Sequence, residues 1–63
     1  MKQWLVIRYN NKDYKEHIYK TFYTEADAVK WFDNLTLTKP ITHFKKFSYE
    51  LHDCYGEIIN ATL

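Results

Sequence analysis

Several residue types are scarce in this sequence of 63 residues, and each scarcity excludes a class of protein. Cysteine occurs once, at Cys54, so the chain forms no disulfide within itself and suits a reducing compartment such as the cytoplasm. A single glycine leaves no glycine-rich loop that could cradle a phosphate group. The sequence has no apolar run long enough to span a membrane and shows no signal peptide. We therefore expect a cytoplasmic protein without membrane contact.

An excess of charge of either sign is also lacking. Nine Lys and Arg residues against eight Asp and Glu residues give a net charge of +1, and the sequence pI is about 7.9. Strong nucleic-acid binders usually have a pI above about 9. A polybasic segment that binds anionic membranes needs a cluster of Lys and Arg residues, which this sequence does not have. The charge balance therefore favours neither nucleic acid nor a membrane as the first choice of partner.

Aromatic residues, by contrast, are abundant, with six Tyr, four Phe and two Trp. A domain of about 60 residues buries only about 60% of the surface that its unfolded chain exposes. Such a core is too small to enclose every ring, so we expect several rings at the surface. Exposed aromatic side chains are typical of interfaces, and their number here indicates a binding surface.

Residues 4–9 form the longest apolar run, and apolar side chains fall on both of its alternations. This pattern predicts a strand covered on both faces, in the interior of a sheet. Polar residues 10–13 predict a turn, and residues 14–22 predict the returning strand. With a loop of two or four residues, the core face of this hairpin consists of Leu5, Ile7, Tyr9, Ile18 and Phe22. A loop of three residues would exchange the two faces.

The second half of the chain predicts a helix and then another hairpin. Thr24, with acidic residues just after it, predicts a helix N-terminus, and the helix runs to about Leu35. Its sheet-facing stripe consists of Ala28, Phe32 and Leu35. Residues 43–52 predict the third strand, whose inward side chains are Phe47, Tyr49 and Leu51. Residues 53–56 predict a bulged turn that sets Leu51 opposite Ile59.

Together these segments predict an α+β fold for a single domain over residues 1–63. The element order is ββαββ, and the economical arrangement is a four-stranded antiparallel sheet with one helix packed on one face. The first strand should lie in the interior of the sheet, and the pattern leaves the rest of the strand order open.

No group of residues in the sequence has the spacing of a catalytic or metal site. Zinc sites usually need four ligands in paired spacings, which one cysteine cannot supply. Cys54 as a nucleophile would need a histidine held within hydrogen-bond reach, and a turn does not preorganise one. Glu16 with Glu50, or Asp27 with Asp33, could form the paired carboxylates of an acid–base catalyst. We interpret all four as solvent-exposed, because nothing in the sequence indicates that either pair is buried or close together. We expect no catalytic residue, metal, cofactor or small-molecule substrate, and hence no enzyme.

One short helix can cover only one face of a four-stranded sheet, so the other face is the candidate binding surface. In the predicted register the partner-binding residues are Trp4, Val6, Arg8, Lys15, His17, Tyr19, Phe44 and Lys46. The favoured interpretation is docking on a protein partner, which is either a second copy of the chain or a host protein. The alternative is a stacking platform for nucleic acid, because cations accompany the aromatic rings. Ordinary cross-strand pairing of these side chains is the third interpretation.

The composition offers one resemblance. A single small domain rich in Lys, Asn, Tyr and Ile, without a cofactor motif, resembles small proteins encoded by phages or mobile elements. Many such proteins bind and block a host factor. This resemblance implies a regulatory module or inhibitor, and no motif in the sequence carries it further.

Overall fold

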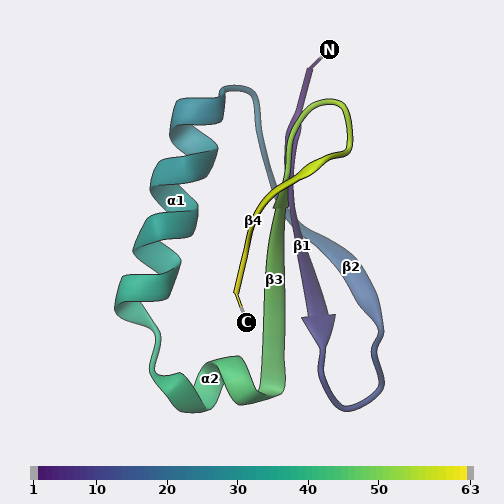
Figure 1. The fold of residues 1–63 in the computed structure, drawn as a ribbon, viewed down its shortest axis with the longest axis vertical. Helices are drawn as coiled ribbons and strands as arrows, with labels where there is room; N and C mark the ends of the chain where they lie inside the picture. The colour runs from purple at the N-terminus through teal and green to yellow at the C-terminus, as the bar shows by residue number, and fades with distance from the viewer. Residues whose placement is uncertain (1, 63) are drawn as a thin grey trace.

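The computed structural model describes residues 2–62 and shows one antiparallel sheet with two helices on one side of it (Figure 1). The elements are β1 (Trp4–Asn10), β2 (Glu16–Phe22), α1 (Glu25–Thr38), α2 (Ile41–Lys46), β3 (Phe47–His52) and β4 (Ile58–Ala61). The strand order is β2-β1-β3-β4. The predicted α+β class and four-stranded antiparallel sheet are confirmed, and so is the interior position of the first strand. The short helix α2 was not expected.

The turn between β1 and β2 covers residues 11–15, later than the predicted turn at residues 10–13, and Tyr9 lies opposite Glu16. The backbone N–H of Asn10 donates to the carbonyl of Lys15 at 2.9 Å, which closes the loop, and the N–H of Tyr14 donates to the carbonyl of Asn10 at 2.7 Å. Tyr14 has a φ of +60°, in the left-handed region that residues with a side chain rarely adopt. The hairpin is therefore tight, with one strained residue at its end.

A bulge in β2 changes which side chains face the helices. Val6 lies opposite Lys20 and Ile7 lies opposite Ile18, so Tyr19 is an extra residue on β2. Because side chains alternate along a strand, one extra residue exchanges the faces of everything beyond it. Tyr19 contacts Trp31 of α1, while Ile18 pairs with Ile7 on the opposite side.

The helix side of the sheet carries the core, and this corrects the predicted faces. Val6 and Leu51 lie opposite each other on β1 and β3, and both are fully buried. The residues predicted as the core face of β1, Leu5 and Ile7, point away from the helices instead. Both alternations of β1 are apolar, so only the pairing register decides which one is buried. The core consists of Val6, Ala28, Phe32, Leu35, Tyr49 and Leu51.

Helix α1 begins and packs as predicted. The Thr24 hydroxyl accepts a hydrogen bond from the N–H of Asp27 at 3.3 Å, which satisfies one of the free donors of the first turn. The predicted stripe of Ala28, Phe32 and Leu35 is buried. The helix ends at Thr38, three residues beyond the predicted end, just before Pro40.

Residues 41–46 form helix α2 rather than the start of the third strand. The side chain of Asn11, in the β1–β2 turn, donates to the carbonyls of Phe44 and Lys45 at 3.3 and 3.1 Å. Carbonyls at the end of a helix lack partners within it, so this distant amide stabilises the last turn of α2. The contact spans more than 30 positions of sequence, so no local pattern could predict it.

The turn between β3 and β4 is the predicted bulged turn. The N–H of Gly56 donates to the carbonyl of Asp53 at 3.1 Å, and Gly56 has a φ of +87°. A second irregularity between Leu51 and His52 inserts Ile59 as an extra residue, so Leu51 lies opposite Asn60. The predicted pairing of Leu51 with Ile59 was wrong by one residue for this reason.

Candidate functional site

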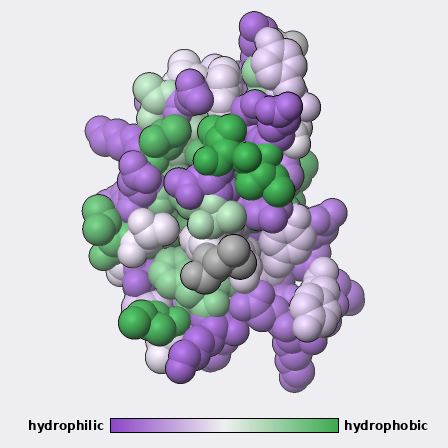
Figure 2. Space-filling view, in the orientation of Figure 1, coloured by the Kyte–Doolittle hydropathy of each residue, from purple (hydrophilic) through white to green (hydrophobic). Residues whose placement is uncertain are grey.

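The face of the sheet that points away from the helices mixes aliphatic and polar side chains. We call it the open face, and its strand residues are Leu5, Ile7, Tyr9, Glu16, Ile18, Thr21, Ser48, Glu50, His52, Ile58 and Ala61. Ile18 and Ile58, on the two edge strands, are 58% and 55% exposed. The central strand supplies half-buried Leu5 and Ile7 between them. Figure 2 shows green, apolar atoms lying open over β4.

A hydrogen-bonded group of three polar side chains lies in the middle of the open face. The Tyr9 hydroxyl donates to Oε1 of Glu50 at 2.7 Å, and Nε2 of His52 lies 3.0 Å from the same oxygen. Partial burial alone raises the pKa of Glu50, but the hydrogen bonds from Tyr9 and His52 outweigh it and hold that pKa below its ordinary value. Glu50 is therefore ionised at neutral pH.

The charges on the open face are of one sign. Its ionised strand residues are Glu16 and Glu50, and none of its strand residues is Lys or Arg, although the chain as a whole carries +1. The Tyr9 hydroxyl lies near both carboxylates. Its hydrogen bond to Glu50, together with burial and the proximity of Glu16, raises the pKa of Tyr9 far above the ordinary value. The open face thus combines aliphatic side chains with two carboxylates.

The structure does not place the predicted partner-binding residues on this face. Trp4 and Val6 lie on the helix side, where Val6 is buried and Trp4 packs against the core. Lys15 closes the β1–β2 turn. Phe44 and Lys46 belong to α2 and are not strand residues. The predicted set was built on the inverted face assignment, so it does not form one surface.

Three residues of that set do meet on the helix side, around Arg8. The Arg8 guanidinium carbon lies 4.8 Å from the ring centre of Tyr19 and 4.7 Å from that of Phe47. Its Nη2 donates to Nε2 of His17 at 2.9 Å. The Tyr19 ring also contacts Trp31 and Tyr49. These rings are engaged with one another and with Arg8, which leaves them poorly placed for stacking on nucleic-acid bases.

Beside this group, His43 packs on the buried Tyr49. The two rings are stacked with centres 5.7 Å apart, and Nε2 of His43 lies 2.7 Å from the Tyr49 hydroxyl. Phe44 meets both rings edge to face. Burial, and then the positive charges of Lys39, Arg8 and Lys46, lower the pKa of His43. His43 is therefore a half-buried residue beside the core that favours its neutral form.

A lysine-lined hollow lies where the β1–β2 turn meets the end of α2. Its volume is about 390 Å³, and its lining residues are Asn10, Asn11, Lys12, Lys45, Lys46 and Phe47. Asn11 is held by its bonds to α2 and by the Ser48 hydroxyl, which donates to it at 2.7 Å. Within residues 2–62, no carboxylate lies within 4.0 Å of the three lysine ammonium groups.

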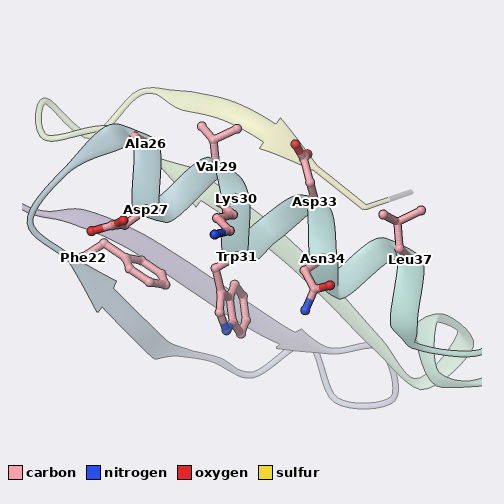
Figure 3. A pocket seen from close by; sticks show the side chains of 9 residues that line it. All are labelled: Phe22, Ala26, Asp27, Val29, Lys30, Trp31, Asp33, Asn34 and Leu37. Carbon is pink, nitrogen blue, oxygen red and sulfur yellow. The ribbon is translucent and has the colours of Figure 1, made fainter.

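A wider hollow of about 910 Å³ runs along α1 beside Phe22 and Trp31 (Figure 3). It contains Asp27 and Asp33, but Figure 3 shows these two side chains pointing away from each other. Paired acid–base chemistry needs two carboxylates in contact with one substrate. This hollow therefore offers no arrangement of that kind.

The part of the chain that the structure describes holds no group of three His, Cys, Asp or Glu side chains that could bind a metal ion. Cys54 is a free, half-buried thiol in the β3–β4 turn. No helix among residues 2–62 has the length and apolar character needed to cross a bilayer.

Comparisons with known proteins give no match: no family model, no curated protein and no solved structure is similar to this chain at a significant level.

Sequence reasoning set Phe47, Tyr49 and Leu51 inward, and the structure agrees, so the alternate β3 residues Ser48, Glu50 and His52 lie on the uncovered side. It missed the apolar part of that side, because Leu5, Ile7 and Ile18 were assigned to the core. No signal in β2 marks the bulge at Tyr19. The regular alternation of β3 was the clearer guide to the faces.

Proposed function

We propose that this protein is a non-enzymatic binding module that docks on a protein partner through the open face. The observation that carries the proposal is a sheet face with exposed isoleucines on both edge strands and no element of the described chain over it. Monomeric proteins rarely leave a continuous apolar face in water, and such faces usually mark interaction sites.

The size of the exposed surface supports the same proposal. The accessible surface is 4755 Å², whereas a monomer of 7.7 kDa typically exposes about 4,300 Å². Six side chains among the described residues form the buried core. A partner that covers the open face would bury further apolar surface and stabilise the fold by mass action.

Docking of this kind acts by occupying a surface of the partner in stoichiometric amount. It fits a regulatory module or inhibitor of a host factor in the cytoplasm, in agreement with the resemblance of the composition to small proteins of phages and mobile elements.

The test is site-specific photo-crosslinking in the native host. Benzoylphenylalanine is introduced at Ile18 on the open face or, as a matched control, at Leu37, which is 84% exposed on α1. We expect a defined adduct from position 18 that excess unlabelled protein competes away, and none from position 37. Adducts from position 37 alone, or equal adducts from both positions, would contradict the proposal.

One observation favours a second candidate function, the binding of nucleic acid at a different place from the open face. The lysine-lined hollow, with Lys12, Lys45 and Lys46, lies at the end of the molecule formed by α2 and the β1–β2 turn (Figure 1). Tyr14, 82% exposed, is in the same turn. A basic hollow beside a free aromatic ring suits phosphate contact and base stacking.

Fluorescence anisotropy with a labelled single-stranded oligonucleotide tests this candidate. We expect binding that weakens steeply between about 50 and 200 mM salt. Replacing Lys12, Lys45 and Lys46 with Gln should abolish it, while the same change at Lys2, Lys20 and Lys30 should have a small effect. Absence of binding at about 50 mM salt would remove the candidate.

A further inference from the structure

The geometry points to the chemistry of the partner: we propose that it presents an arginine or lysine side chain, surrounded by aliphatic residues, to Glu50 and Glu16 on the open face. This inference rests on the proposed docking function. It goes further because it states what the partner must carry at the centre of the interface.

No Lys or Arg of the described chain balances the acceptors at this place, and His52, 3.0 Å from Oε1 of Glu50, carries a charge only when it is protonated. Both hydrogen bonds that Glu50 receives reach Oε1, and no bond to Oε2 is formed within residues 2–62. The Glu16 carboxylate has no cation within 4.0 Å among these residues either. The Tyr9 hydroxyl lies near both carboxylates, and its oxygen can still accept a hydrogen bond.

Covering the open face makes this imbalance costly. In the free protein, water solvates the accessible quarter of the Glu50 side chain, which is 26% exposed. An apolar partner would remove that water and leave an ionised carboxylate with no permanently charged partner, only Tyr9 and His52 at Oε1, which is unfavourable. A cation delivered to Oε2 removes the penalty, and an arginine fork can contact a carboxylate with two parallel bonds.

The same charges argue against the other occupants of this face. Two copies packed face to face would bring four carboxylates, Glu16 and Glu50 from each, into one interface without a Lys or Arg from either open face. Like charges brought together at an interface repel one another, so self-association through this face is disfavoured. Phosphates of nucleic acid would meet the same repulsion.

The test is selection of a displayed library of random 12-residue peptides against the wild-type protein. We expect selected peptides to be enriched in Arg or Lys flanked by aliphatic residues. Titrated into ¹⁵N-labelled protein, they should shift the amide signals of residues 5, 7, 9 and 18. Glu50→Gln should weaken their binding about tenfold or more. Glutamine keeps an oxygen that accepts from Tyr9, so the variant tests charge rather than folding.

Glu57→Gln is the matched control, since it removes the same charge from an exposed position outside the open face, and its binding should equal that of wild type. Peptides that shift the open-face signals but lack a cation, or bind Glu50→Gln equally well, would overturn this inference and leave the docking function standing. Peptides whose signals map only to α1 or to the lysine-lined hollow would overturn both. A wild-type dimer that protects the open-face amides would also overturn the inference.

Discussion

The Tyr9 hydroxyl donates a 2.7 Å hydrogen bond to Glu50 across two neighbouring strands, on the one side of the sheet that the helices do not cover. A polar contact of this kind fixes an ionised carboxylate beside the aliphatic side chains of Ile7 and Ile18. It therefore gives the open face a defined charge as well as an apolar area.

Replacing the hydroxyl should change the acidity of Glu50. In Tyr9→Phe, burial still raises the pKa of Glu50 but one of the bonds that lower it is gone, so we expect that pKa to rise. The carboxyl carbon shift of Glu50, followed by NMR against pH, measures this. An unchanged titration would show that His52 alone holds the carboxylate.

The same variant should alter the response of stability to acid. The folded-state pKa of Glu50 is lowered, so its contribution to stability is present above the ordinary pKa of 4.5 and is lost as pH falls through the folded value. Tyr9→Phe should reduce this loss while costing about 1 kcal/mol of stability at neutral pH. Urea denaturation at several pH values measures both effects.

Two side-chain truncations, one on each face of the β1–β2 hairpin, should report which face packs against the core. Val6→Ala removes fully buried atoms and should cost about 2 kcal/mol. Ile18→Ala, at a side chain that is 58% exposed, should cost less than about 1 kcal/mol. Denaturation midpoints with an unchanged m-value give the comparison. The reverse order would restore the face assignment that the sequence pattern suggested.

Local signals in the sequence were sufficient for much of the fold. The capping threonine Thr24, the buried helix stripe and the glycine turn at Gly56 were predicted because each depends on residues within a few positions of one another. The interior position of β1 followed from its double-sided apolar pattern.

The errors came from features that local pattern does not encode. The bulge at Tyr19 exchanged the faces of residues 20–22 of β2, and a similar insertion at Ile59 shifted β4 by one residue. Helix α2 depends on Asn11, which lies far away in sequence. The candidate site changed because both faces of β1 are apolar: Leu5 and Ile7 were grouped correctly with Ile18, but that face lies away from the helices rather than against them.

The stacked pair of His43 and Tyr49 should make stability depend on pH in a second range. The folded-state pKa of His43 is lowered by burial and by Lys39, Arg8 and Lys46, so the folded protein binds its proton less readily than the unfolded chain. Stability should therefore be full above the ordinary pKa of 6.5 and fall as pH decreases below it.

His43→Phe should flatten this dependence between about pH 7 and pH 5 because it keeps an aromatic ring on Tyr49 but cannot be protonated. His17→Gln, at an exposed histidine, serves as the control and should keep it. Denaturation midpoints across this range are the measurement. Equal slopes in wild type and His43→Phe would assign the effect to other groups.

Substitution of Tyr14 should change the stability of the protein and its oligonucleotide binding in opposite directions. Its φ of +60° is costly for a tyrosine and is tolerated by asparagine, so Tyr14→Asn should stabilise the protein by about 0.5 to 1 kcal/mol. Tyr14→Ala keeps the left-handed cost and should be close to neutral. Thermal or urea denaturation separates the two variants, and a less stable Tyr14→Asn would contradict the strain argument.

Oligonucleotide binding should respond in the opposite direction. If the exposed Tyr14 ring stacks on a base beside the lysine-lined hollow, Tyr14→Asn should bind about tenfold more weakly although it is more stable. Tyr14→Phe, which keeps the ring, should bind like wild type. A strained residue that improves binding and lowers stability is typical of a functional position, because strain persists where the side chain is needed. Equal affinity of all three proteins would leave the strain at Tyr14 without a role in binding.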